Sequence, residues 1–236
     1  TGVATWVGFD LDGRNDIAWT GVLARRFLLQ KVQLEHYHKQ LSALASATMP
    51  PAAATAIKDA LRRIDTTLTH LQVHYRFFSD HDPDRDPGHR ALQKASREMV
   101  SDAKNRLTGP EPLIASLEKA LGVKSLPPKS QKDLAALLAT LKQDGLTPAE
   151  VHFRLNAAQI HNAIRKHVDL ATHPADPLFR QAYMDLLLRR FRKIKPAQVH
   201  FGSVLEEQAS ARRMFMLIQQ IVKHIDGHSP IRFLIA

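Results

Sequence analysis

The fold depends on the stretch Val151-His152-Phe153-Arg154-Leu155, which interrupts a sequence whose apolar residues otherwise recur with the period of amphipathic helices. Apolar and polar residues alternate within it, as they do in a β-strand that buries one face. The three apolar side chains would then lie on one side of the strand. His152 and Arg154 would lie on the other, away from the hydrophobic core.

Two further stretches, residues 5–10 and 231–236, are short and apolar or alternating, and they also predict strands. Because such isolated strands need neighbours, we interpret them as strands of a β/α barrel whose other strands lie outside this chain. The expected fold class is mainly α with a few short β-strands, as part of a helix-rich α/β (TIM-like) barrel. The competing interpretation is one long helix over 148–170, because Thr147-Pro148-Ala149-Glu150 is a good helix start.

Helices are expected over most of the remaining chain, between loops that contain proline or glycine. The last one has the clearest signals: Ser203 and Glu206 have capping-box spacing, and Gly227 and Pro230 follow its end. Its predicted buried stripe is Phe215, Ile218, Val222 and Ile225. The predicted helices cover residues 17–46, 52–79, 89–107, 112–121, 130–143, 157–170, 176–193 and 203–225.

The composition is that of a globular protein, since 44% of the 236 residues are hydrophobic and 24% are charged. We expect residues 1–236 to form a single helix-rich segment of a soluble protein, because no apolar run approaches the roughly 20 residues of a membrane helix. A cytoplasmic location is expected because a chain without cysteine fits a reducing compartment. The absence of cysteine excludes disulfides and thiol nucleophiles. The chain starts at Thr1 and stops at Ala236 inside an apolar run, so we expect a partial chain.

The formal charge of +10 favours an anionic partner. Lysine and arginine are scattered along the predicted helices without interleaved aromatic residues that would stack on bases. The pattern therefore does not favour nucleic acid. We interpret most of the basic residues as solvated helix surface, and a few of them suit a small substrate that carries phosphate or carboxylate groups.

The segment from Thr5 to Asn15 reads Thr-Trp-Val-Gly-Phe-Asp-Leu-Asp-Gly-Arg-Asn. It resembles the Ser-Trp-x-Gly-Gly-Asp-Arg-Asp-Gly-Asn-Pro signature of the phosphoenolpyruvate carboxylase family, in a divergent bacterial form. Leu11 stands where the family has arginine, and we hypothesise that Arg14 supplies this charge from a shifted position. The matching residues are Trp6, Gly8, Asp10, Asp12 and Gly13.

Asp10 and Asp12 have two interpretations. By the resemblance they belong to the substrate-binding segment. The residue types alone suggest hydrogen-bonding side chains that organise the turn before the first long helix. A metal site is less favoured, because no third oxygen ligand is suggested nearby.

The stretch 151–156 is similar to the family's Leu-Asp-Ile-Arg-Gln strand, and Arg154 falls at its arginine. By this resemblance Arg154 lies at the barrel mouth and contacts the phosphate-bearing substrate. Residues 229–236 look like a further strand of the family. On that strand, Arg232 would face the mouth or pair with a helix carboxylate.

The resemblance implies a lyase of carbon fixation that joins bicarbonate to phosphoenolpyruvate, giving oxaloacetate and phosphate. It also implies a homotetramer and magnesium or manganese, bound by residues outside this chain. The family's catalytic histidine would lie upstream and its metal carboxylates downstream, so we expect no catalytic or metal-binding residue within the chain and no activity from the chain alone. The alternatives are a catalytically inactive relative and a basic helical module that binds nucleic acid or an acidic partner.

Other polar groupings have simpler interpretations. His70 and His74 are four residues apart on a predicted helix, but two histidines are only half of a metal site. The alternating carboxylates of Asp80–Asp86 lack the glycine and glutamate of a calcium loop, so we interpret them as a solvated loop. Asn156 is a candidate cap for a helix carrying His161 and Arg165, a pair for which an anion site and ordinary helix surface remain equally open.

Overall fold

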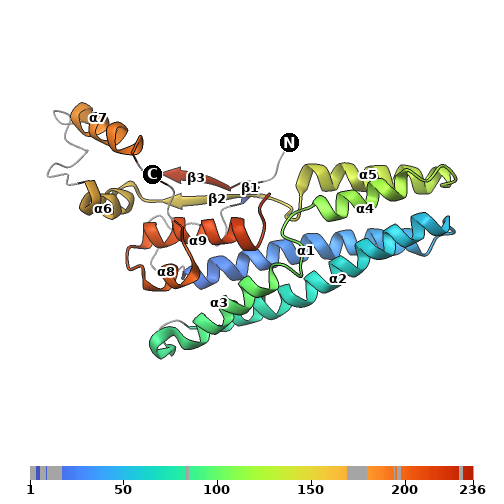
Figure 1. The fold of residues 1–236 in the computed structure, drawn as a ribbon, viewed down its shortest axis with the longest axis horizontal. Helices are drawn as coiled ribbons and strands as arrows, with labels where there is room; N and C mark the ends of the chain where they lie inside the picture. The colour runs from blue at the N-terminus through green and yellow to red at the C-terminus, as the bar shows by residue number, and fades with distance from the viewer. Residues whose placement is uncertain are drawn as a thin grey trace.

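The protein is mainly helical and carries three short strands, in agreement with the expected secondary-structure class. The molecule is elongated, with a helical bundle at one end and the strands beside its other half (Figure 1). None of the described helices combines the length and apolar character that crossing a membrane requires. The computed structural model describes residues 4–5, 9, 18–82, 85–168, 180–193, 195, 198–228 and 231–235.

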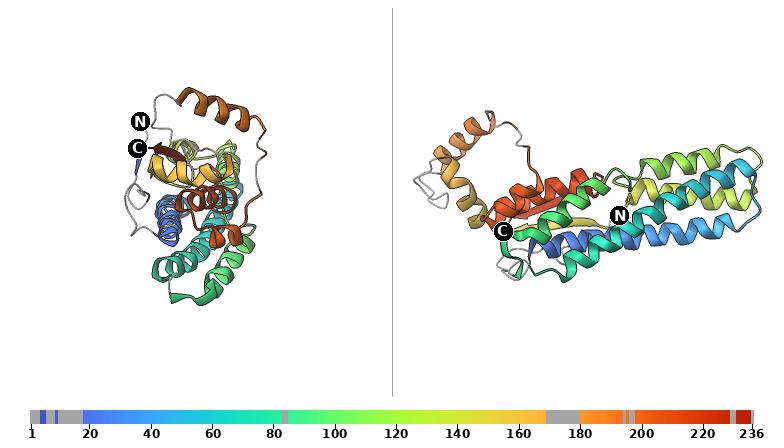
Figure 2. Two further views of the ribbon diagram at one scale, coloured as in Figure 1. Left: turned by 90° about the vertical axis from the view of Figure 1, so that its left-hand side faces the viewer. Right: turned by 60° about the horizontal axis from the view of Figure 1, so that its bottom comes forward.

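Helices α1 (Trp19–Ala45) and α2 (Pro51–Asp80) form a long antiparallel pair that is the axis of the molecule. Pro51 occupies the first position of α2, where a missing N–H leaves no helical bond unmade. Phe27 and Phe78 stack between the two helices with ring centroids 6.0 Å apart. Helices α4 (Glu111–Leu121) and α5 (Pro128–Asp144) pack on the distal half of this pair, as Figures 1 and 2 show.

The turn that leads into the central strand is fixed by Tyr37 of α1. Gly145, with φ of 62°, ends α5 in a conformation that favours glycine. The buried Tyr37 hydroxyl donates a hydrogen bond to the Gly145 carbonyl oxygen at 2.9 Å. Burial raises the pKa of Tyr37 to about 12; the nearby Asp144 carboxylate adds to this rise, whereas the hydrogen bond with Gln33 opposes it.

Stability at high pH is therefore expected to depend on Tyr37. Unfolded tyrosine titrates near pH 10, so between pH 10 and 12 only the unfolded state loses this proton. The free energy of unfolding should fall by about 1.4 kcal/mol per pH unit from this residue in that window. Urea unfolding at successive pH values should show a shallower decline for Tyr37→Phe. Equal slopes in both proteins would contradict the expectation.

The three strands form a parallel sheet in the order β1-β2-β3. Strand β1 is Ala4–Thr5, β2 is Glu150–Leu155 and β3 is Ile231–Ile235. The register places Phe153 beside Phe233, with ring centroids 6.0 Å apart. Phe233 in turn lies 4.9 Å from Phe215 of α9 (Ser210–His224), so the apolar face of the sheet is packed on this helix.

The strand predictions have different outcomes. The strand over 151–155 is confirmed, and the alternative of one helix over 148–170 is wrong. The strand over 231–236 is confirmed for 231–235, while Ala236 lies outside the described residues. The strand over 5–10 is wrong at Phe9, which lies in a turn, because the described part of β1 is only Ala4–Thr5. The described residues form an open three-stranded sheet and not a closed barrel.

The single helix expected over 203–225 is wrong. The chain forms α8 (Phe201–Glu206), an extended link, and then α9. His200 caps α8 by accepting a bond from the Ser203 main-chain nitrogen, so Ser203 lies inside a helix rather than at its start. A hydrogen bond within the link stabilises it: the Glu207 carboxylate accepts from the main-chain nitrogen of Ala209 at 2.9 Å.

The predicted stripe of α9 is also partly wrong. Ile218 and Ile225 are buried, but Phe215 and Val222 are each 41% exposed. Their places in the core are taken by the adjacent positions Met214, Leu217 and Ile221. The buried arc is shifted by one residue because α9 packs against α1, α6 and α8, an arrangement that helical periodicity does not contain.

Helix α3 (Arg90–Asp102) starts later and ends earlier than the expected 89–107. A short 3-10 turn, Pro87–His89, precedes it, and the Asp86 carboxylate accepts bonds from the main-chain nitrogens of Ala91 and Leu92. The interpretation of Asp80–Asp86 as a solvated loop thus misses its capping role. After Asp102 the chain leaves the helix, and hydrogen bonds of Arg106 and Leu107 then join it to α9 and α2.

Two further helices are described in the second half of the chain, α6 (Ala157–Val168) and α7 (Arg180–Phe191).

Candidate functional site

The polar face of the sheet is built by the alternating residues of β2. Val151, Phe153 and Leu155 are each 1% exposed on the apolar face, and the residues between them point the opposite way. His152 lies beside Arg232 of β3, and Arg154 lies beside Leu234. The face therefore combines a basic residue from each of two strands, as the alternation in the sequence predicted.

Arg232 is held by the neighbouring strand. Its guanidinium pairs with the carboxylate of Glu150, and the imidazole of His152 lies 3.7 Å from the same carboxyl group. Arg232 was expected to face a barrel mouth or to pair with a helix carboxylate; it pairs with a carboxylate, but this one comes from β2 and not from a helix. Because Glu150 balances its charge, Arg232 is a weaker anion ligand than an unbalanced arginine would be.

Arg154 occupies the carboxyl-terminal half of the central strand and is half-buried. Its main-chain nitrogen donates a hydrogen bond to the carbonyl oxygen of Phe9 at 3.2 Å. The Phe9 ring meets the Phe153 ring edge-on with centroids 5.1 Å apart. The structure thus brings Thr5 and Phe9, the described residues of the segment 5–15, against the strand that carries Arg154, although helices α1 to α5 separate them from it in sequence.

Asp10, Asp12 and Arg14, the other expected substrate-binding residues, lie outside the described residues.

Helix α6 begins directly after β2. Asn156 accepts a hydrogen bond from the main-chain nitrogen of Ala158 at 2.8 Å, so the predicted cap is confirmed. The positive end of the α6 dipole therefore lies just beyond the strand that carries Arg154. His161, one turn into the helix, is buried at 6% exposure, and the Arg165 side chain is outside the described part of the structure.

A buried ion pair fixes the opposite ends of the strands. The Arg26 guanidinium on α1 meets the Asp226 carboxylate, just before β3, at 2.6 Å, and both side chains are essentially inaccessible. Asp226 also accepts hydrogen bonds from the Thr147 hydroxyl at 3.5 Å and the His228 main-chain nitrogen at 3.1 Å. Burial lowers the pKa of Arg26, and the charge of Asp226 opposes this effect. Sequence reasoning missed this pair, because its residues are 200 positions apart.

The sheet face does not suit a divalent metal ion. Glu150 is the carboxylate on this face within the described residues, and it is already paired with Arg232. Within the same described residues, the side chains close enough to share an ion lie instead between α2 and α3. The hollows found on the described surface lie between helices, and neither Arg154 nor Arg232 lines them.

Comparison with known proteins does not assign this chain to a family. No family model matches the chain. A search of curated proteins finds no match either.

Proposed function

We propose that this chain is part of a phosphoenolpyruvate carboxylase-like enzyme, in which Arg154 binds the phosphate-bearing substrate. One observation carries the proposal: Arg154 lies on the central strand of a parallel sheet, directly against the turn at Phe9 that leads into the Asp-x-Asp-Gly segment. Phe9, from the first stretch that resembles the family, is thereby bonded to Arg154, from the second.

The position of Arg154 suits an anion site. Ligands of parallel α/β sheets bind beyond the carboxyl ends of the strands, where side chains from several strands converge. Arg154 lies in the carboxyl-terminal half of β2, and the capped amino end of α6 follows directly. A guanidinium can bind phosphate through two parallel hydrogen bonds, and the helix dipole adds to the attraction.

The proposed chemistry needs such cations. Carboxylation of phosphoenolpyruvate passes through carboxyphosphate and an enolate, both of which concentrate negative charge, and fixed positive groups lower the barrier by stabilising that charge as it develops. In the proposal Arg154 holds and orients the substrate phosphate. Magnesium or manganese is assigned to residues outside this chain, since Glu150, the carboxylate on the polar face among the described residues, is already paired with Arg232. The catalytic residues are assigned outside the chain as well.

Arg154→Gln is expected to weaken the binding of phosphoenolpyruvate to the full chain about tenfold or more, because hydrogen bonds to charged groups contribute about 1.5–3 kcal/mol. Isothermal titration at low ionic strength measures this change. Arg62→Gln is the matched control, since Arg62 is 68% exposed on α2, where it pairs with Asp59, and its loss changes the net charge equally. Equal weakening in both variants would reduce the effect to non-specific charge.

Two further measurements separate the proposed enzyme from its alternatives. A steady-state carboxylation assay of the full-length parent protein tests whether this member is active. Binding of phosphoenolpyruvate without turnover would assign it as an inactive relative. Steeply salt-dependent binding to random oligonucleotides, together with no affinity for phosphoenolpyruvate, would assign it as a basic nucleic-acid-binding module.

A further inference from the structure

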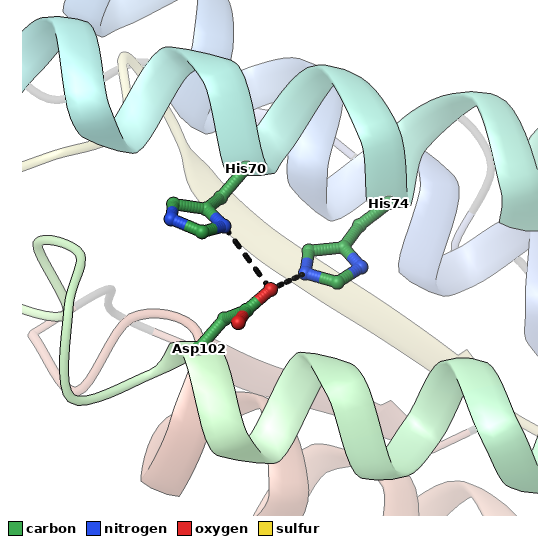
Figure 3. A group of neighbouring side chains, drawn as sticks. All are labelled: His70, His74 and Asp102. Carbon is green, nitrogen blue, oxygen red and sulfur yellow. Dashed lines mark hydrogen bonds and ion pairs between the residues drawn. The ribbon is translucent and has the colours of Figure 1, made fainter.

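We propose that His70, His74 and Asp102 form a binding site for a divalent transition-metal ion, for which zinc is the best-fitting occupant. The two histidines lie one turn apart on α2, and Asp102 is the last residue of α3 (Figure 3). Their ligand atoms all lie within 4.8 Å of one another. This site is independent of the proposed carboxylase function and uses none of the residues of the sheet face.

The geometry is that of a nearly assembled coordination shell. The Nδ1 atom of His70 lies 3.1 Å from Oδ2 of Asp102, and the Nε2 atom of His74 lies 3.3 Å from the same oxygen. In a tetrahedral zinc site with bonds of about 2.0–2.1 Å, neighbouring ligand atoms are about 3.3 Å apart. Two of the three distances between ligand atoms are thus already close to those of a zinc site. The third closes when the two imidazole rings, which point to the same carboxylate in Figure 3, turn slightly toward each other.

His74 is prepared to act as a ligand. Its side chain is 3% exposed, and its ring stacks on Phe27 with centroids 5.5 Å apart, which fixes the direction of Nε2. The Nε2 atom is the ring nitrogen that faces Asp102, at 3.3 Å from its Oδ2. An imidazole binds a metal ion through such a ring nitrogen.

The Nε2 atom of His74 also lacks a hydrogen-bond partner among the described residues. It lies 3.3 Å from Oδ2 of Asp102, which is within hydrogen-bonding distance, but the two groups are poorly aligned, so Asp102 satisfies this nitrogen only weakly. A buried polar atom without a partner is costly. A metal ion between the carboxylate and the two rings would satisfy this nitrogen.

The environment leaves room for exchangeable ligands. His70 and Asp102 are 28% and 29% exposed, so solvent reaches one side of the site. Three protein ligands with an open position are typical of exchangeable or catalytic zinc sites, whereas structural sites are closed by four. The nearby Arg106 guanidinium adds positive charge, but its Nη2 donates to the carbonyl oxygen of His224, which anchors that part of the group at the end of α9.

Binding would also link separate elements. Asp102 precedes the segment in which the main-chain nitrogen of Leu107 donates to the Thr67 hydroxyl of α2 at 2.9 Å. A metal at His70 and His74 would tether the same segment to α2 a second time. The apparent stability of the protein should therefore rise with metal concentration.

The site is tested by titrating zinc into the chelator-treated full chain, with isothermal titration and thermal unfolding as readouts. We expect one equivalent to bind and the unfolding temperature to rise with zinc. His70→Ala and Asp102→Asn should each weaken binding at least tenfold and abolish the rise. His38→Ala is the matched control, because it removes a different cross-helix contact, the 3.0 Å pair between His38 and Asp65, and should leave zinc binding unchanged.

Cobalt provides a check on coordination that does not depend on stability. Bound Co²⁺ should show the visible absorption of a low-symmetry site in the wild-type chain and in His38→Ala, but not in Asp102→Asn. Circular dichroism of Asp102→Asn verifies that this variant is folded. A wild-type chain that binds no zinc, or that binds it equally well without His70 and Asp102, would reduce the cluster to hydrogen-bonded side chains and overturn the proposal.

Discussion

Replacing Asp226 with alanine is expected to lower the free energy of unfolding by about 3–5 kcal/mol, because the substitution leaves the Arg26 guanidinium buried without its counter-charge. Arg26 is 1% exposed, and two of its nitrogens have no other hydrogen-bond partner in the described part of the chain. The bonds that Asp226 accepts from Thr147 and His228 are lost as well. Chemical denaturation of the two proteins measures the difference.

The double variant Arg26→Met/Asp226→Leu distinguishes a buried charge from a simple loss of packing. Removing both charges and keeping similar volume is often neutral, so the double variant should recover most of the stability lost in Asp226→Ala. If Asp226→Ala costs less than about 1 kcal/mol, water or another group must reach Arg26, and the pair does not fix the strands as the structure indicates.

Phe153→Ala is expected to cost about 3–5 kcal/mol, the range for removing a buried aromatic side chain. Phe153 is 1% exposed and contacts both Phe9 and Phe233, so its ring links β2 to the turn at Phe9 and to β3. Because the sheet has only one packed face, the loss should also loosen β2 locally. Hydrogen exchange should show faster exchange of the β2 amides than of those in α1.

Leu234→Ala is the matched control for this substitution. Leu234 belongs to the same sheet but lies on the polar face and is 42% exposed. Its truncation should change the free energy of unfolding by less than about 1 kcal/mol, since surface substitutions have small effects. Similar losses in the two variants would mean that the two residues are equally buried, contrary to the 1% exposure of Phe153 and the 42% exposure of Leu234.

The candidate sites differ in how far sequence reasoning could reach them. The position of Arg154 could be predicted, because alternation over five residues determines which side chains share a face of a strand. The proximity of His70 and His74 could also be predicted, since residues four apart share a helix face. The proximity of Asp102 could not be predicted, because Asp102 belongs to another helix and no sequence period connects it to α2.

Helix boundaries were predictable where local sequence signals decide them and not where other parts of the chain do. The long helices α1 and α2 were predicted to within about two residues, because their apolar periods are long and proline marks the start of α2. The break between α8 and α9 was missed, since Ser203 and Glu206 satisfy the spacing of a capping box while lying inside α8. His200 supplies the actual cap, a role that local preferences do not favour for histidine.

By itself the sequence determined the helical class, because this depends on short-range periodicity and backbone preference. It also determined the side on which Arg154 would lie if 151–155 were a strand, while the tertiary structure decided that it is a strand and not part of one helix over 148–170. Only the tertiary structure decided that Phe9 lies against β2, that Arg26 pairs with Asp226, and that Asp102 lies beside His70 and His74. Each of these contacts joins residues that are distant along the chain. Their proximity follows from the burial of many apolar side chains at once, and no local pattern records that collective result.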